Sequence, residues 1–242
     1  MLATVALPVY NNRDICWLAL EGLCRQKDPG DWELIICEEN NGGHCGVEFF
    51  DGYKERLFDA GCTRVIYIPV KSGRFYLSEK WLYMAKLAKG EVFLLQGSDD
   101  YPDARRVQLA KQAVAEGYDW FSYNRFYCYL KGHGVYEYHD WDNHLHTGID
   151  KGTRTEYLLK TKPRQLRSGV DSWLLHSVHR IVKDIRVKQI TVDYTGVSTT
   201  GFNTITRQRE FPIYAKMYPY GSTEKKLQDI LPPDVAEKLE KL

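Results

Sequence analysis

The stretch Val92-Phe93-Leu94-Leu95-Gln96-Gly97-Ser98-Asp99-Asp100 decides the fold class. Its first four residues are apolar, which is typical of a strand buried on both faces of a parallel sheet. Ligands of open α/β sheets bind beyond the carboxyl ends of the strands, so the acidic pair that follows is well placed for a hard divalent cation. The alternative is that Asp99 and Asp100 only begin a turn and cap a helix after Pro102.

Two earlier segments have the same character. Thr4–Asn11 is an apolar strand that ends in a polar turn, and Leu34–Cys37 is a second buried strand that leads into Glu38-Glu39. Between them, the apolar spacing over residues 14–26 predicts an amphipathic helix. Short strands alternate with helical segments up to about residue 118, as in βαβ units. The chain is therefore predicted to be an α/β protein with a mostly parallel central sheet flanked by helices.

The order of these signals resembles that of the family 2 glycosyltransferases of GT-A fold. The matching segments, in chain order, are Pro8-Val9-Tyr10-Asn11, Leu23-Cys24-Arg25-Gln26, Glu38-Glu39-Asn40, Ala88-Lys89-Gly90 and Gly97-Ser98-Asp99-Asp100. Each motif is common by itself, but five in this order are specific. The resemblance covers about the first half of the chain and implies an inverting enzyme that uses a nucleotide-sugar donor.

The resemblance also implies a donor site. Pro8, Tyr10 and Glu39 match the wall that holds the nucleotide base and ribose in this family. Glu39 stands where the family usually has aspartate, which keeps the acceptor oxygens but lengthens the side chain by one methylene. The arginine that the family often carries before the fourth strand is missing, and Lys80 or Arg74 is the candidate to contact a phosphate instead. A solvated surface lysine is the alternative for Lys80.

The acidic motif matches at its last two positions. The resemblance implies that Asp100 binds Mn²⁺ or Mg²⁺ and that Asp99 binds the ribose or the metal, whereas Gly97 stands where an aspartate is often found. One carboxylate can be sufficient, because diphosphate oxygens and waters complete an octahedral shell. A UDP-sugar is the expected donor.

The segment Arg167-Ser168-Gly169-Val170-Asp171-Ser172-Trp173-Leu174 resembles the family's motif for the catalytic base. Asp171 is therefore the candidate that accepts the proton of the acceptor hydroxyl, a contribution worth ~10²–10⁴ in rate. The alternative reading is an N-cap, because residues 172–183 have helical spacing. The two roles are compatible.

Composition bounds the rest of the interpretation. The 242 residues, 43% hydrophobic with net charge +1, suit a single GT-A domain. We expect a nucleotide-sugar-binding half over 1–117, an acceptor-binding half over 118–210 and a C-terminal tail over 211–242. The sequence shows neither a membrane span nor a signal peptide, which predicts a cytoplasmic protein, with a virus-encoded protein acting in a host cytoplasm as one form of it. The six cysteines are expected to be reduced packing thiols.

The acceptor half differs in composition from the donor half. Residues 118–141 are rich in Trp, Tyr and Phe, which suit stacking on sugars or bases but equally suit strands, and a Lys131–Gly134 break predicts a hairpin. Ten Lys/Arg against three acids give residues 151–190 a charge of +7, whereas 16 basic against 22 acidic residues give residues 1–150 a charge of −6. This asymmetry suggests an anionic ligand, either the nucleotide diphosphate or modified DNA, against the alternative of a solvated basic surface.

Two further patterns are weaker. His139, His144 and His146, with two nearby aspartates, could bind a metal, but acceptor binding or a plain surface is favoured. The apolar stripe of Val235, Leu239 and Leu242 predicts docking on the protein itself or on a twin subunit, which would make a homodimer.

The sequence therefore predicts a metal-dependent, inverting glycosyltransferase. Its acceptor is a glycan or small molecule, or a hydroxymethylated base in viral DNA. The alternatives are a catalytically inactive sugar- or nucleic-acid-binding module of the same fold, and a nucleotidyltransferase. The latter should carry a Gly-rich, Arg-containing loop after the first strand, where this chain has Pro8-Val9-Tyr10-Asn11.

Overall fold

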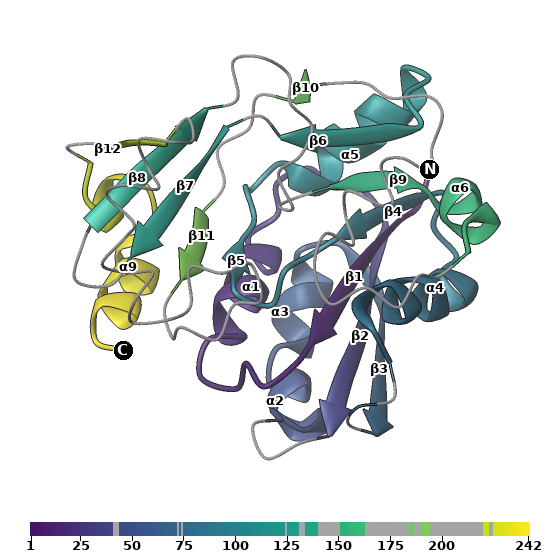
Figure 1. The fold of residues 1–242 in the computed structure, drawn as a ribbon, viewed down its shortest axis with the longest axis horizontal. Helices are drawn as coiled ribbons and strands as arrows, with labels where there is room; N and C mark the ends of the chain where they lie inside the picture. The colour runs from purple at the N-terminus through teal and green to yellow at the C-terminus, as the bar shows by residue number, and fades with distance from the viewer. Residues whose placement is uncertain are drawn as a thin grey trace.

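A computed structural model describes residues 1–40, 44–71, 73, 75–123, 125–130, 134–139, 151–162, 184–185, 190–193, 220–222 and 225–242. These residues form a larger and a smaller β-sheet, with helices on both faces of the larger one (Figure 1). The larger sheet has the strand order β10-β6-β9-β4-β1-β2-β3. Its strands are β1 (Ala3–Val9), β2 (Trp32–Asn40), β3 (Cys62–Lys71), β4 (Val92–Leu95), β6 (Trp120–Tyr123), β9 (Gly152–Arg154) and β10 (Asp184–Ile185).

The four neighbouring strands β4, β1, β2 and β3 run parallel, and β9 pairs antiparallel with both β4 and β6. Parallel strands need crossover connections, and helices in the sequence between them supply these. The predicted α/β class with a mostly parallel central sheet is confirmed.

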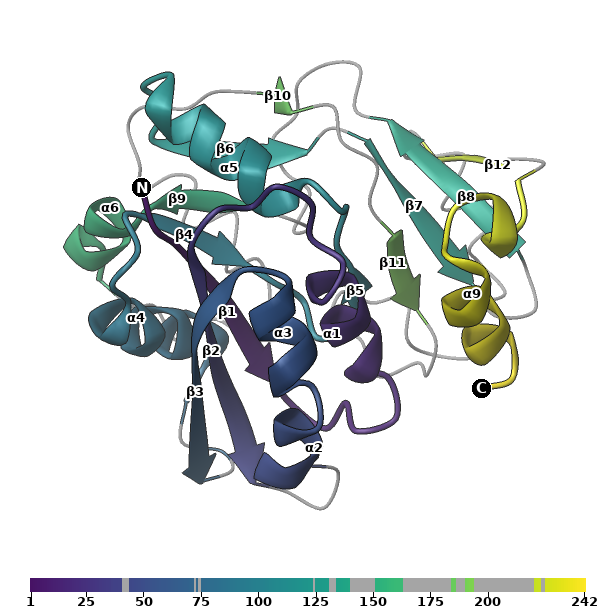
Figure 2. The ribbon, with the colours of Figure 1, turned by 180° about the vertical axis from the view of Figure 1, so that it is seen from behind.

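Helices cover both faces of the larger sheet because its strands are apolar on both faces (Figures 1 and 2). In β1, Val5 and Leu7 pack toward one cluster, whereas Ala6 packs toward the other, as the period of two requires. The first face carries α1 (Trp17–Leu23), α2 (Val47–Asp51), α3 (Lys54–Asp59) and α5 (Arg106–Ala115), and the second carries α4 (Leu77–Leu87) and α6 (Thr155–Lys160).

The smaller sheet has the order β12-β8-β7-β11-β5. Its strands are β5 (Asp100–Tyr101), β7 (Arg125–Leu130), β8 (Gly134–His139), β11 (Ile190–Asp193) and β12 (Tyr220–Ser222). β7 and β8 pair antiparallel from Arg125–His139 to Leu130–Gly134, so the hairpin predicted at the Lys131–Gly134 break is confirmed. β5 begins at Asp100, the second residue of the acidic pair, and so lies where the chain passes from the larger sheet to the smaller one.

The C-terminal residues pack on the chain itself. A 3-10 helix, η1 (Leu227–Asp229), leads into α9 (Pro233–Glu240), whose Val235 and Leu239 are buried against Trp17 and Leu18 of α1. Arg25 binds Asp234 at 2.6 Å beside this contact. Of the two sites predicted for the C-terminal apolar stripe, docking on the protein itself is confirmed.

The cysteine side chains that the structure describes are Cys16, Cys24, Cys37, Cys45 and Cys62, and none of these five lies in a disulfide. Burial raises the pKa of Cys24, Cys37 and Cys62 to about 11, which keeps these thiols protonated at neutral pH. In the described part of the chain, no helix has the length and apolar character needed to cross a membrane.

Candidate active site

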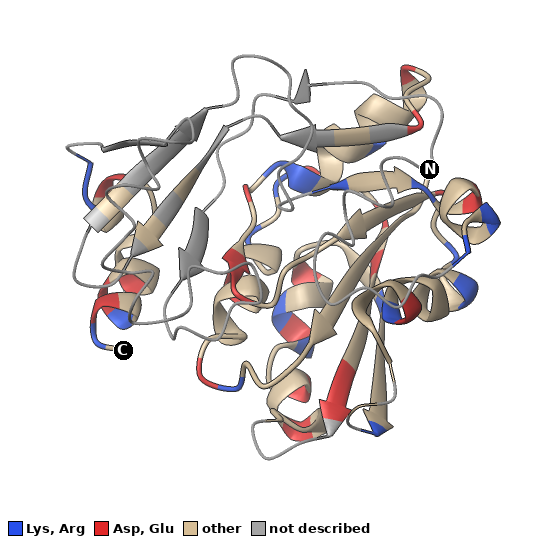
Figure 3. Cartoon of the chain, in the orientation of Figure 1, with Lys and Arg blue, Asp and Glu red and all other residues tan. Residues whose placement is uncertain are grey.

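The carboxyl ends of β1, β2 and β4 bring the candidate donor-binding residues to one edge of the larger sheet (Figure 1). Val9 pairs with Glu38, so Tyr10 and Glu39 follow at the same level of neighbouring strands. Acidic residues, red in Figure 3, gather at the end of β2 and at β5. Ligands of open α/β sheets generally bind beyond this edge, which is where the sequence analysis expects the donor.

Glu39 and Lys80 form a buried ion pair at this edge. Lys80 Nζ lies 2.6 Å from Glu39 Oε1, and the side chains are only 4% and 5% exposed. The backbone N–H of Gly73 donates to Glu39 Oε2 at 3.1 Å, so both carboxylate oxygens have a donor. The alternative that Lys80 is a solvated surface lysine is therefore wrong, because α4 points its side chain inward from a position next to the end of β2.

Tyr10 and Pro8 complete this part of the edge. Lys80 Nζ lies 5.6 Å from the centre of the Tyr10 ring, and Tyr10 is 51% exposed. The last pair between β1 and β4 is Ala6–Leu95, and the Ala6 carbonyl accepts a hydrogen bond from Gln96 N–H just beyond it. The backbone nitrogen of Pro8, two residues further on, faces the same side of β1, where no described strand is left to pair with. The missing N–H of Pro8 thus costs no ladder bond there. An exposed aromatic face beside a fixed carboxylate suits the base and ribose of a nucleotide.

The acidic pair lies over Gly97. A Cβ atom on Gly97 would be 2.2 Å from Asp100 Oδ2 and 3.3 Å from Asp99 Oδ1. Both carboxylates therefore converge above a residue that has no side chain, and an aspartate at position 97 would collide with Asp100. Asp100 is 5% exposed, and burial raises the pKa of Asp99. The glycine that departs from the family pattern is thus required by the way Asp100 is placed.

Three hydrogen bonds that the sequence analysis missed hold this loop in place. Asn12 Nδ2 donates to Ser98 Oγ at 2.6 Å, and Gln96 Nε2 donates to the carbonyl oxygens of Gly97 and Asp100 at 2.8 and 2.9 Å. For Asn12 and Ser98, the only sequence signal of this role was their place beside the predicted site residues. Gln96 gave none, since a single glutamine at a strand end is common.

Glu38 has a structural role. Its carboxylate accepts hydrogen bonds from the backbone N–H groups of Cys45 and Gly46 and from the Tyr67 hydroxyl. Burial and the bond to Glu38 raise the pKa of Tyr67, which therefore stays protonated as the donor. Of the two adjacent glutamates, only Glu39 meets the other candidate site residues.

Several predicted site residues lie outside the described residues: Arg74, Asp171, His144 and His146. The structure gives only the backbone of His139, which ends β8. Among the residues it does describe, no group of three or more His, Cys, Asp or Glu side chains could hold a metal ion.

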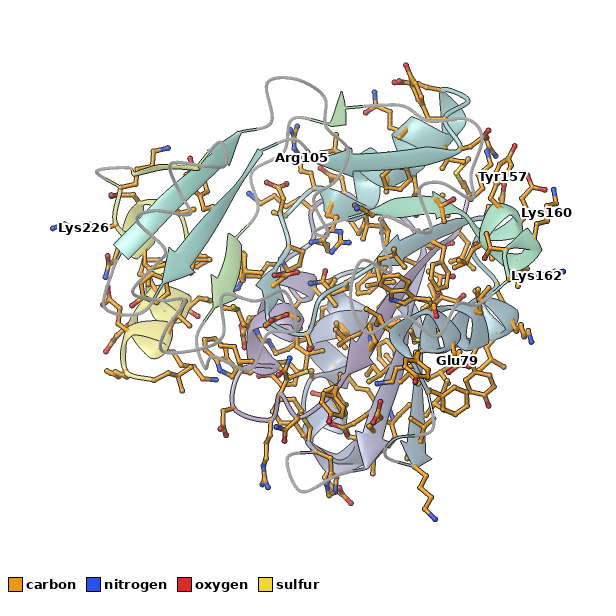
Figure 4. All side chains as sticks on the ribbon, in the orientation of Figure 1. Glu79, Arg105, Tyr157, Lys160, Lys162 and Lys226 are labelled. Carbon is orange, nitrogen blue, oxygen red and sulfur yellow. The ribbon has the colours of Figure 1, made fainter. Side chains whose placement is uncertain are left out.

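The described part of the basic segment is divided between internal and exposed side chains. Lys151 is fully buried, and Arg154 binds Asp119 at 3.1 Å. Lys160 and Lys162 are exposed, and Figure 4 shows them at the outer end of α6, on the side of α4. Only half of the four described cations of this segment can therefore contribute to a basic surface.

Comparison with known proteins identifies the family and the fold of the chain. The family described as Glycosyl transferase family 2 matches residues 4–180, which is well over half of the chain. The chain belongs to glycosyl transferase family 2. This membership confirms the predicted family and the assignment to the glycosyltransferases, and the match extends past the half of the chain in which the motifs are visible. No protein among the curated sequences matches the chain.

Solved glycosyltransferase structures share the fold of this family member. Residues 1–349 of S. aureus TarS, in complex with UDP-GlcNAc, have a TM-score of 0.63 at 18% identity over 83% of this chain and 61% of that one. The mannosyltransferase PcManGT from Pyrobaculum calidifontis, in complex with GDP-Man and Mn²⁺, has a TM-score of 0.58 at 15% identity over 99% of this chain and 70% of that one. The GT-A fold is confirmed. The chain thus spans less than two thirds of the TarS segment.

The residues at the sheet edge fit a divalent cation. Asp99 and Asp100 direct carboxylate oxygens toward the same small volume above Gly97, where a Cβ would collide with them. Mg²⁺ is commonly held by one or two carboxylates together with phosphate oxygens and waters, so two acidic ligands are enough.

Proposed function

We propose that this family member transfers a sugar from a nucleotide-sugar donor to an acceptor hydroxyl, with inversion and with the help of Mn²⁺ or Mg²⁺. The observation that carries the proposal is the convergence of the Asp99 and Asp100 carboxylates above Gly97, on the same sheet edge as Tyr10, Glu39 and Lys80. A diphosphate and its metal ion require a pair of carboxylates next to residues that can bind the nucleotide.

The donor we propose is a UDP-sugar. Tyr10 offers an exposed ring, and Glu39 offers carboxylate oxygens that can accept from the base or the ribose. Lys80 binds Glu39, so we assign it to the nucleotide end of the site rather than to a phosphate. TarS, in complex with UDP-GlcNAc, and PcManGT, in complex with GDP-Man, share the fold, which supports a nucleoside diphosphate donor without deciding its base.

The reaction uses the two acidic groups in different ways. Asp99 and Asp100 would hold the cation, and the bound cation would neutralise the charge that develops on the diphosphate leaving group. Asp171 is the proposed base, on its match to the family motif. It takes the proton of the acceptor hydroxyl while that oxygen bonds to the anomeric carbon, and the bond from this carbon to the diphosphate oxygen breaks on the opposite face.

For the acceptor we propose a hydroxyl of a glycan or small molecule. The described cations give little support to a DNA acceptor, because Lys151 is buried and Arg154 is paired with Asp119. Hydroxymethylated DNA remains the second acceptor to test, since binding of a polyanion depends steeply on salt.

The experiment offers a panel of nucleotide sugars with Mn²⁺ to the full chain and measures transfer to simple glycans and to hydroxymethylated DNA. Asp100→Ala and Asp171→Ala are compared with the wild type, and Asp59→Asn, an exposed aspartate on α3, is the matched control. We expect transfer to one acceptor class in the wild type and in Asp59→Asn.

The two variants separate the roles. Asp100→Ala should lose Mn²⁺ binding together with transfer, whereas Asp171→Ala should keep donor and Mn²⁺ binding and lose only transfer. A wild-type chain that binds neither Mn²⁺ nor any nucleotide sugar would contradict the proposal and leave a binding module that has kept only the fold.

A further inference from the structure

Arg106 is an arginine with no exposed surface, at the first position of α5. Its guanidinium donates hydrogen bonds to Gln96 Oε1 and to the carbonyl oxygen of Leu95. Leu95 ends β4 and Gln96 follows it, so both acceptors come directly before the acidic loop. A fully buried guanidinium is expensive to desolvate, so its presence next to a proposed metal site calls for a specific role.

Gln96 connects Arg106 to the loop that carries the carboxylates. Its backbone N–H donates to Ala6 O at 2.9 Å, which fixes the residue to β1. Its side-chain Nε2 donates to Gly97 O at 2.8 Å and to Asp100 O at 2.9 Å. One amide group therefore joins both ends of the four-residue loop from Gly97 to Asp100.

The chemistry of the partners fixes the orientation of this amide. A guanidinium can only donate, so the face of Gln96 that meets Arg106 must be its carbonyl oxygen. The two loop carbonyls can only accept, so the opposite face must be the NH₂ group. Arg106 thus prevents the amide flip that would turn the Gln96 oxygen toward Gly97 O and Asp100 O and repel them.

The start of α5, which carries Arg106, is held in place by contacts with Gln26 and Gly22. Gln26 binds both sides of the α5 N-terminus, since its Nε2 donates to Asp103 O at 2.8 Å and its Oε1 accepts from Val107 N–H at 3.0 Å. Pro102 packs so tightly on Gly22 of α1 that a Cβ there would lie 2.5 Å from Pro102 Cδ. The start of α5 is therefore anchored on α1, independently of the acidic loop.

We propose that Arg106 and Gln96 are positioning residues for the divalent cation: Arg106 orients the Gln96 amide, and the amide holds the loop so that the Asp99 and Asp100 carboxylates converge above Gly97. The inference rests on the metal site of the proposed function. It adds two residues that touch neither the cation nor the donor, and it requires their loss to act through the loop.

The test measures Mn²⁺ binding by electron paramagnetic resonance of the free ion, in titrations of the full chain with MnCl₂, with and without UDP. Gln96→Glu keeps the size of the side chain and the acceptor for Arg106 but removes both N–H donors to the loop. Outer-shell changes of this kind weaken metal binding by roughly 10–100-fold, and we expect at least a tenfold rise in Kd. The added negative charge alone would act in the opposite direction and tighten cation binding.

Arg106→Gln and Arg106→Lys test the orientation step. Lysine is also a pure donor and should keep the Kd for Mn²⁺ within about threefold, whereas a neutral amide allows Gln96 to flip and should raise it about tenfold. Arg105→Gln is the matched control, because Arg105 precedes Arg106 in the sequence and is exposed. Circular dichroism melting identifies the variants that fold.

The outcomes are distinguishable. If the wild type binds no Mn²⁺ with or without UDP, the proposed metal site itself is wrong. If the wild type binds Mn²⁺ and folded Gln96→Glu binds it as tightly or more tightly, the positioning role is wrong while the proposed function stands. If Gln96→Glu does not fold, the arginine variants decide, and equal affinities for Arg106→Gln and Arg106→Lys would overturn the inference.

Discussion

The ammonium of Lys80 lies 2.6 Å from Glu39 Oε1, and both side chains are almost fully buried at the carboxyl edge of the larger sheet. Lys80 comes from α4 and Glu39 from the end of β2, so the ion pair joins a helix to the strand that carries a candidate donor ligand. The pair links the stability of the fold to the position of Glu39, a residue of the proposed nucleotide site.

Removal of either partner leaves a buried charge without its counterion. We expect Lys80→Met to lower the free energy of unfolding by about 3 kcal/mol and to weaken UDP binding, because Glu39 loses its fixed position. Lys86→Met on the exposed side of α4 is the control and should change stability by less than about 0.5 kcal/mol.

The double variant Lys80→Met/Glu39→Gln completes the cycle for this pair. It should be less destabilised than the sum of the two single variants, since no charge is then left uncompensated. Denaturant melts and UDP titrations measure both effects. Additive losses of stability would show that the two side chains do not interact as the structure places them.

Gly97 is predicted to be intolerant of any side chain. Gly97→Ala places a Cβ 2.2 Å from Asp100 Oδ2, so this carboxylate must move away from Asp99. We expect at least a tenfold weaker binding of Mn²⁺, measured calorimetrically, with a folded protein. Gly52→Ala, where the nearest atom is 3.4 Å away, should bind Mn²⁺ as the wild type does. Undiminished binding in Gly97→Ala would refute the convergence of the two carboxylates.

The stability of the chain should fall in acid through Glu21. A bidentate hydrogen bond from Arg56 of α3, at 2.8 and 2.7 Å, lowers the pKa of Glu21 below its ordinary 4.5. A lowered folded-state pKa gives stability that is fully present above pH 4.5 and is lost as the pH falls through the folded-state value. Glu21→Gln should therefore cost about 1 kcal/mol at pH 7, and the difference should shrink in acid melts. A pH-independent cost in Glu21→Gln would contradict the assignment.

Leu239 anchors α9 on α1. Its side chain is fully buried with Trp17 and Leu18, so Leu239→Ala should lower the free energy of unfolding by about 2–5 kcal/mol. Leu159, which is 46% exposed on α6, is the control, and its replacement by alanine should cost less than about 0.5 kcal/mol. Equal effects of the two changes in thermal melts would mean that α9 does not pack as described.

Part of the fold was predictable from the sequence because three of the parallel strands, β1, β2 and β4, contain uninterrupted apolar runs. Val92–Leu95 and Leu34–Cys37 are buried on both faces, and both became strands of the parallel core. The helix predicted over 14–26 is shorter, Trp17–Leu23. Ile15 and Cys16, within the predicted range, instead form turns in which their N–H groups donate to Asn12 O. Gln26 lies beyond the helix and binds Asp103 just before the start of α5, 77 residues away in sequence.

The candidate site was predictable only in part. Glu39, Asp99 and Asp100 follow strands, and position after a strand is a local signal. The ion pair between Glu39 and Lys80 was not predictable, because a lysine on a helix is usually exposed. Only the packing of α4 on the sheet turns Lys80 inward. The roles of Gln96 and Arg106 also depend on tertiary packing, because their side chains meet only when α5 packs beside the acidic loop.

The pairing of β5 with β11 connects the acidic pair to the smaller sheet. Asp100 begins β5, and its backbone pairs with Thr191 of β11, so the residue that carries a proposed metal ligand is also an edge position of the smaller sheet. Its side chain belongs to the donor edge, whereas its main chain belongs to the sheet built from the later part of the sequence. A change in the pairing of β5 with β11 would therefore displace the carboxylate that the proposed metal site uses.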